Sequence, residues 1–228
     1  MPSELGLPHV FIEDIENPVL GENDEHHFRK VLRIKDGDSI TVADGLGNWR
    51  CCVYGKSIEA TGEIIRVEEA KVKISIGFSL IKSGRPELVV QKLTELGVDC
   101  IVPVAAQRSV VQWNEKKSKD NVSRLNRIAR EASMQSRRVY LPKIEPLIGA
   151  LEIRKSRKVS MAHPGGNELS VDNNFLLIGP EGGWSEEEIE GADICSLGTG
   201  ILRSETAAIA SAAILVALRD GRVRPSKV

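Results

Sequence analysis

From residue 74 onward, short apolar segments alternate with segments of helical period, and this alternation constrains the fold of the chain more than any other feature. Strands are expected at residues 74–80, 100–104, 159–162, 175–178 and 194–197. Helices are expected at 87–96, 186–192 and 205–220, with a further basic helix around 122–134. Such alternation is typical of a mostly parallel sheet that helices cover, so we predict the α/β class.

The first part of the chain has a different pattern. Its strands are expected at residues 9–12, 39–43, 49–54 and 62–67, with a helical patch at 25–32 and turn signals at Asp36-Gly37-Asp38 and Asp44-Gly45. We predict a small β-rich domain at residues 1–70 and an α/β domain at 71–228, with the charged segment 68–73 as the boundary.

Positive charge gathers in one segment, although the net charge of the chain is only -1. Residues 108–158 contain 14 Lys and Arg against five Asp and Glu, a local balance of +9. In the basic helix, apolar residues share one face and arginines the other, so we predict phosphate contacts there. An ordinary solvated helix surface is the alternative. The arginines of interest in this segment are Arg124, Arg127 and Arg130 on the helix, followed closely by Arg137 and Arg138.

Composition excludes several classes of protein. No apolar stretch is long enough to cross a bilayer, and no secretion signal precedes the first strand, so a soluble protein is expected. The four cysteines show neither CxxC spacing nor nearby histidines, which argues against zinc and disulfides. We therefore expect no metal, no membrane contact and a cytoplasmic location.

A glycine-rich loop follows the strand at 175–178, with the sequence Gly-Pro-Glu-Gly-Gly at residues 179–183. Ser185 and Glu188 form a capping-box signature that marks the next helix start. The glycines allow a ligand to approach the backbone at the carboxyl end of a strand, where open α/β sheets bind ligands. A tight turn that needs no ligand is the alternative. The loop is neither a P-loop nor GxGxxG.

A second loop of the same design spans residues 196–207, and the two loops could face each other. The helix dipole alone can explain Glu205 in the first turn of the final helix. Arg203, just before that helix, gains nothing from the dipole, which favours a role in a site.

Together these motifs resemble the ribosomal small-subunit methyltransferase E family of the SPOUT superfamily. The resemblance covers nearly the whole chain and rests on the order of its motifs, with Ser204 standing where threonine is usual. The motifs are Gly179–Gly183, Leu197-Gly198, Ile201–Ala207, Gln91-Lys92, Glu95–Gly97, Pro103, Arg108-Ser109, Glu131-Ala132, Gln135–Arg137, His27, Val31–Arg33 and Gly37-Asp38.

The resemblance implies a PUA-like β-barrel followed by an α/β domain with a deep trefoil knot, in a homodimer. It implies methylation of N3 of a uridine in 16S rRNA, within the small ribosomal subunit, with S-adenosylmethionine (SAM) as the methyl donor. By position, the residues that would form the cofactor pocket are Met161, Ala162, Gly179, Pro180, Glu181, Gly183, Ser196, Leu197, Gly198, Ile201 and Leu202.

Uracil N3 carries a proton that must leave, so a base or a cation that stabilises the uracil anion is required. We assign the cation role to Arg203 and the base role to Glu205. In the N-terminal domain, Arg29, Lys30 and Arg33 are expected to contact rRNA phosphates. Two alternatives stay open: a related SPOUT enzyme that acts on another RNA such as tRNA, and a non-catalytic assembly factor.

Overall fold

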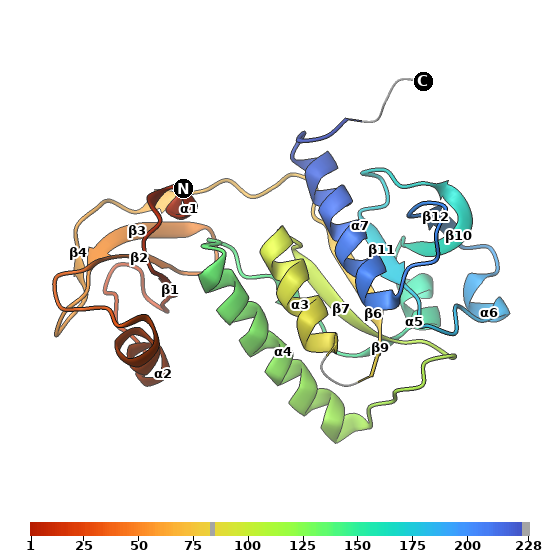
Figure 1. Ribbon diagram of the computed structural model, residues 1–228, viewed down its shortest axis with the longest axis horizontal. Coiled ribbons are helices and arrows are strands. Elements are labelled where there is room, and N and C mark those ends of the chain that lie inside the picture. Colours follow the sequence, from red (N-terminus) through yellow and green to blue (C-terminus); the bar gives the residue numbers. More distant parts are fainter. Residues whose placement is uncertain (83–84, 225–228) are drawn as a thin grey trace. The chain divides into compact units, whose positions relative to one another are not determined.

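The computed structural model describes residues 1–82 and 85–224. The chain divides into two compact units, which we treat separately (Figure 1). The first unit comprises Met1–Ala70 and Arg130–Leu141, and the second comprises Lys71–Ala129 and Pro142–Val228. The segment after residue 129 thus returns to the first unit, a connection that local sequence patterns do not reveal. The division into domains at residue 70 stays a prediction.

The first unit is built on a five-stranded sheet of order β1-β2-β3-β4, with β5 also pairing with β3. β1 is parallel to β2, and the other pairs are antiparallel. The predicted β-rich module is confirmed. The elements are α1 (Pro2–Leu5), β1 (His9–Phe11), α2 (Glu22–His26), the π-helical turn η1 (His27–Leu32), β2 (Ser39–Ala43), β3 (Asn48–Val53), β4 (Glu59–Ala60) and β5 (Ile65–Arg66).

One strand of this unit is shorter than predicted. Pairing is confined to Ile65–Arg66 rather than residues 62–67. The Gly62 carbonyl accepts two hydrogen bonds from the Arg50 guanidinium, at 3.0 and 2.8 Å. A side chain therefore occupies the acceptor that a longer strand would use in the ladder.

The second unit contains a seven-stranded sheet of order β12-β10-β11-β6-β7-β8, with β9 also pairing with β7, and every pair is parallel. This confirms the predicted parallel α/β fold. Its elements are β6 (Ser75–Ser79), α3 (Arg85–Leu96), β7 (Cys100–Ala105), α4 (Glu115–Gln135, whose last turns belong to the first unit), β8 (Lys143–Ile144), β9 (Ile148–Gly149), α5 (Ala150–Ser156), β10 (Ser160–Glu168), β11 (Phe175–Ile178), α6 (Glu186–Ile189), β12 (Asp193–Ser196) and α7 (Ser204–Arg219).

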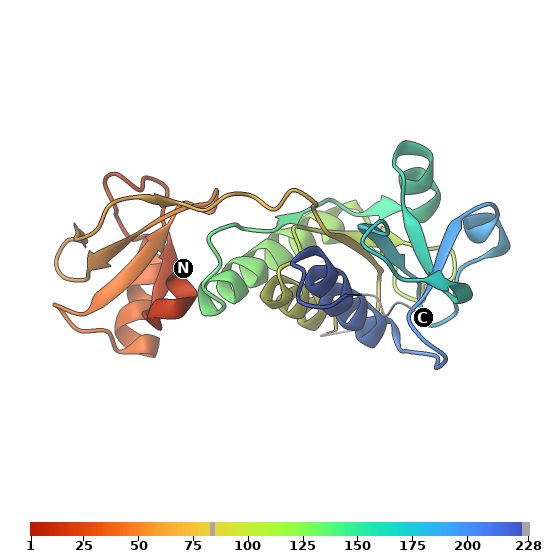
Figure 2. The same cartoon turned by 90° about the horizontal axis from the view of Figure 1, so that it is seen from above.

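Helices cover both faces of this sheet. Because successive strand residues point to opposite faces, neighbouring residues of one strand belong to different cores. Leu176 and Ile178 of β11 pack in one core with α3, α4 and α7, whereas Leu177 packs in a second core with α5 and Trp184. Figures 1 and 2 show α3 and α7 side by side along the first of these faces. Strands buried on both faces explain the continuous apolar runs of the sequence.

Several local features differ from the sequence-based prediction. α6 ends at Ile189 rather than 192, since Gly191 adopts a positive φ of 66°. The strand expected at 159–162 continues to Glu168 through a bulge, in which Ala162 and Asn167 both pair with Cys195. The elements α1, β4, β8, β9 and α5 were not predicted. The trefoil knot stays a prediction.

Within the described part of the chain, no helix is long and apolar enough to span a membrane. No group of three or more His, Cys, Asp or Glu among these residues could hold a metal ion. Burial raises the pKa of the thiols of Cys52, Cys100 and Cys195 to about 11. These thiols therefore stay protonated near neutral pH, and thiolate chemistry is not expected of them.

Candidate active site

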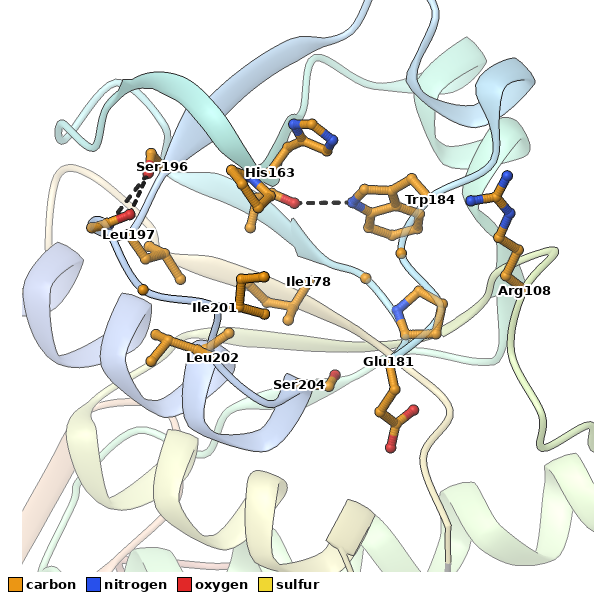
Figure 3. A pocket seen from close by; sticks show the side chains of 18 residues that line it. Arg108, His163, Ile178, Glu181, Trp184, Ser196, Leu197, Ile201, Leu202 and Ser204 are labelled. Atoms are coloured by element: carbon orange, nitrogen blue, oxygen red, sulfur yellow. Dashed lines mark hydrogen bonds between the residues drawn. The ribbon is translucent and has the colours of Figure 1, made fainter.

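A pocket of about 340 Å³ lies at the carboxyl ends of β11 and β12 and beside the bulge of β10, the strand between them. Its walls are residues 162–164 of β10, the loop 179–183 after β11 and the loop 197–202 between β12 and α7. As predicted, the two glycine loops face each other (Figure 3). This is the edge at which open parallel sheets bind ligands, and the volume falls within the range of small-molecule sites.

The first loop is held by a tight turn and by an indole ring. The Gly183 amide donates to the Pro180 carbonyl at 2.8 Å, and Gly183 has a φ of +69°. Gly179 packs directly against the Trp184 ring. A Cβ at Gly179 would lie 3.0 Å from that ring, so a larger residue would be crowded here. The Trp184 indole N–H donates to the Ala162 carbonyl at 3.1 Å, which ties this loop to β10.

The second loop is closed by the Ser196 hydroxyl. This oxygen accepts from the Gly198 amide at 3.3 Å, and the hydroxyl donates to the Gly198 carbonyl at 3.0 Å. A Cβ placed on Gly183, Gly198 or Gly200 would meet no other atom within 4 Å. Because these three glycines line the pocket, bare backbone faces open space there. Such a surface suits a ligand that is bound through backbone groups.

The N-terminus of α7 closes one side of the pocket. Its N-cap residue, Arg203, makes no side-chain capping bond. Ser204 lines the pocket and is 4% exposed, yet its hydroxyl has no hydrogen-bond partner among the described residues. A buried donor without a partner costs about 1–3 kcal/mol, so this hydroxyl is a strong candidate for a ligand contact.

The structure brings most of the predicted cofactor residues together. Ten of them line the pocket: Ala162, Gly179, Pro180, Glu181, Gly183, Ser196, Leu197, Gly198, Ile201 and Leu202. Met161 does not, because its side chain is fully buried in the core beneath β10. The strand alternation that turns Ala162 toward the pocket turns Met161 away from it.

The two predicted catalytic residues are not among the residues that line the pocket. The Arg203 side chain is exposed. Glu205 is 14% exposed; its Oε1 lies 3.2 Å from a guanidinium nitrogen of Arg85, and its Oε2 is buried with no hydrogen-bond partner among the described residues. Their catalytic roles stay predictions.

Sequence reasoning missed eight residues that line the pocket: Arg108, His163, Pro164, Ile178, Trp184, Gly200, Ser204 and Ala207. A signal existed for Pro164, since Pro164-Gly165-Gly166 is a third turn-rich run after the predicted strand 159–162. Gly200, Ser204 and Ala207 lie within the second predicted loop. Arg108 belongs to one of the family motifs quoted above, but nothing in the local sequence places it at the pocket, which it reaches from the loop after β7.

Several arginines predicted to contact RNA also bond to the protein. Arg29 donates to the Tyr54 hydroxyl at 2.8 Å and pairs with Glu25 at 3.1 Å. Arg124 pairs with Glu87 at 2.9 Å. Arg137 donates from Nε to the Leu7 carbonyl at 2.8 Å and from a terminal nitrogen to Gly6.

The other basic residues of this predicted set are Lys30, Arg33 and Arg127, which are exposed, and Arg138, which is half-buried. Arg130, on the same face of α4 as Arg124, makes two hydrogen bonds to the Asp24 carboxylate at 2.8 and 2.7 Å. Two arginines of the face predicted to contact phosphates, Arg124 and Arg130, thus already pair with carboxylates of the protein. Contact of the predicted set with RNA stays a prediction.

Comparison with protein families gives two matches. The model of the RNA methyltransferase domain matches residues 68–216, more than half of the chain, and the model of the RNA methyltransferase PUA domain matches residues 20–54. A curated relative from Borreliella burgdorferi, ribosomal RNA small subunit methyltransferase E 2, is 30% identical over 86% of this chain and 88% of its own length.

Solved structures of similar fold include two with SAM bound. A ribosomal RNA small subunit methyltransferase E from Neisseria gonorrhoeae has a TM-score of 0.80 at 26% identity and covers 93% of this chain and 98% of its own. A putative methyltransferase from Legionella pneumophila has a TM-score of 0.81 at 26% identity, with coverages of 92% and 97%.

Proposed function

Because the chain belongs to the ribosomal RNA small subunit methyltransferase E family, we propose that it transfers the methyl group of SAM to N3 of a uridine in 16S rRNA. One observation carries the proposal: the pocket at the carboxyl ends of β11 and β12, where bare glycine backbone of the two loops faces open space. The similar structures that contain SAM support it.

The residues of the pocket fit this cofactor. The apolar side chains of Ile178, Leu197, Ile201 and Leu202 suit the faces of an adenine ring, and the open backbone of the two loops offers amides and carbonyls for its polar edge. The unpartnered hydroxyl of Ser204 supplies one further donor. These residues would hold SAM, which supplies a methyl group on a sulfonium centre, already a strong electrophile.

The protein must mainly orient the target base and manage one proton. N3 lies on the Watson–Crick edge of uracil, so the base has to be unpaired or rotated out of its stack before it can reach the pocket. As the N3 proton leaves, negative charge develops on the uracil. The uncapped N-terminus of α7 and the Ser204 hydroxyl are positioned donors for that charge.

For the proton itself we propose the Glu205 carboxylate as acceptor, through its unpartnered Oε2. The Arg85 guanidinium holds the other oxygen and fixes the carboxylate in the first turn of α7. Arg203, exposed beside it, is proposed to act on the RNA strand or on the uracil anion once RNA is bound. Neither residue lines the pocket of the isolated chain, so both roles require movement on RNA binding.

The substrate context and the assembly are part of the same proposal. We propose the assembled small ribosomal subunit as the substrate and a homodimer as the active form. Leu88 of α3 and Ile214 of α7 expose apolar side chains, 41% and 38% exposed, on two helices that pack against each other. Light scattering in solution tests the dimer, and a fully active monomer would contradict it.

The decisive experiment is transfer of radiolabelled methyl from SAM to small ribosomal subunits from cells that lack the enzyme. Label on a uridine N3 supports the proposal. Transfer to tRNA instead favours a SPOUT enzyme with another substrate. No transfer to subunits, naked rRNA or tRNA, with SAM binding absent in calorimetry, favours a non-catalytic assembly factor.

A further inference from the structure

The loop at residues 106–109 brings a cation to the pocket from a fourth strand. It follows the carboxyl end of β7, and its Arg108 lines the pocket on the side of Trp184, opposite the loop of Leu197 (Figure 3). Of the described residues that line the pocket, Arg108 is the one with a permanently charged cationic side chain.

A buried carboxylate holds this loop in place. Glu188 is 1% exposed; its Oε1 accepts from the Gln107 amide at 2.8 Å, and its Oε2 accepts from the Ser185 amide at 2.9 Å. The same side chain therefore caps α6 and anchors the residue next to Arg108. The Gln107 side chain donates to Glu187 at 2.7 Å and adds a second link.

The two loops also touch directly. A Cβ at Gly182 would lie 3.4 Å from both the Cβ and the carbonyl oxygen of Arg108, so the backbones of the two loops are in close contact. The backbone of Arg108 is therefore held between the anchored Gln107 and Gly182, at one side of the pocket. An unconstrained surface arginine would have no such support.

The guanidinium, in contrast, has little to bind within the protein. Its hydrogen bond to the Gly182 carbonyl, at 3.5 Å, is at the outer limit for such a bond, and most of its five donors have no partner among the described residues. The carboxylate of Glu181, the acidic residue of the pocket, lies 3.8 Å from a guanidinium nitrogen of Arg85. An exposed cation with unused donors, carried on an anchored backbone at a pocket edge, is suited to an anion.

We propose that Arg108 is an anion-binding residue of the methyl-transfer site, which holds a carboxylate or phosphate oxyanion of one of the two substrates. The inference rests on the proposed function, because that function defines the substrates. The carboxylate would be that of the methionine part of SAM, and the phosphate one that flanks the target uridine. Both present paired oxygens that match the guanidinium fork.

The experiment compares wild type with Arg108→Gln, Arg108→Lys and the control Lys158→Ala, which removes one exposed positive charge outside the pocket. Calorimetry measures the Kd of SAM and of 5′-methylthioadenosine, which keeps the nucleoside but lacks the carboxylate. Filter binding measures the affinity for small ribosomal subunits at several salt concentrations.

If Arg108 binds the carboxylate, Arg108→Gln weakens SAM binding roughly 10- to 100-fold and leaves methylthioadenosine unchanged. If it binds a phosphate, SAM binding is unchanged and binding to the small subunit weakens roughly tenfold. The slope of the logarithm of that affinity against the logarithm of the salt concentration then falls in magnitude by about one. In either case Arg108→Lys weakens binding less than Arg108→Gln does. Lys158→Ala also has a smaller effect than Arg108→Gln on whichever of the two affinities changes.

Two results overturn the inference. The first is wild-type affinity of Arg108→Gln for both SAM and the small subunit. The second is equal weakening of SAM and methylthioadenosine binding, which indicates a disturbed pocket. Failure of the proposed function is distinct from either, since wild type itself would then neither bind SAM nor transfer methyl.

Discussion

The pocket and the predicted RNA-contacting arginines differ in how the protein uses its polar groups. Around the pocket, the Cβ positions of Gly183, Gly198 and Gly200 face open space, and the Ser204 hydroxyl has no hydrogen-bond partner among the described residues. The arginines Arg29, Arg124 and Arg137, in contrast, bond to protein carboxylates, a hydroxyl or carbonyls. In this protein, a donor without a protein partner therefore indicates a ligand site better than positive charge does.

The largest expected effect concerns His9, which supports the turn that carries Arg137 and Arg138. Its ring lies 2.8 Å from the Thr41 hydroxyl and 2.9 Å from the Arg138 carbonyl. Burial, opposed by the hydrogen bond to Arg138 and aided by the charge of Arg137, lowers the pKa of His9 to about 4. Its usual value is 6.5.

Between pH 4 and pH 6.5 the His9 imidazole is protonated in the unfolded chain but neutral in the folded chain. Stability from this group is therefore complete above pH 6.5 and is lost as the pH falls toward 4, by roughly 3 kcal/mol. Urea unfolding at pH 7, 5.5 and 4 measures this loss. His9→Gln should remove that part of the pH dependence, and an unchanged slope would show that protonation of His9 does not cause the loss.

The next effect concerns the bare backbone of the pocket. Gly200→Val places a side chain in space that no protein atom occupies, without strain from a positive φ. We expect SAM affinity to fall roughly 30-fold, about 2 kcal/mol, with no change in the free energy of unfolding. Gly21→Val is the matched control, because its Cβ would meet only Asp24, at 3.8 Å. Unchanged SAM binding in Gly200→Val would exclude Gly200 from the cofactor site.

A third prediction separates structural from RNA-contacting arginines. Arg33 and Arg137 are the described non-glycine residues with positive φ, 55° and 56°. Arg137→Ala should lower the free energy of unfolding by about 1–2 kcal/mol, since two carbonyls lose their donor. Arg33→Ala should change it by less than about 0.5 kcal/mol, because Arg33 is exposed. Urea unfolding of both variants is the measurement, and equal losses would remove the distinction.

The smallest expected effect concerns the Ser204 hydroxyl. Ser204→Ala should reduce methyl transfer roughly fivefold, about 1 kcal/mol, while stability is unchanged or slightly higher, because a buried unpaired donor is removed. Ser204→Thr keeps the hydroxyl and should retain activity. Single-turnover assays with both variants decide the matter, and equal rates in Ala and Thr variants would assign the hydroxyl no role.

By itself the sequence determined the parallel α/β fold of the second unit, because strand and helix periods are local signals. Its resemblance to the family indicated, by position, ten of the residues that line the pocket. It also indicated the β-rich first unit. It assigned Met161 to the pocket, whereas the alternation along β10 turns that side chain into the core.

Only the tertiary structure decided which polar side chains are left for a ligand. Arg130 binds Asp24, 106 positions away, and Arg137 binds Gly6, 131 positions away, so no window of sequence could show that these guanidinium groups are engaged. The Glu188 carboxylate fixes Gln107 from 81 positions away and brings Arg108 to the pocket. Secondary structure follows local periodicity, but the pairing of charges depends on which elements the fold brings together.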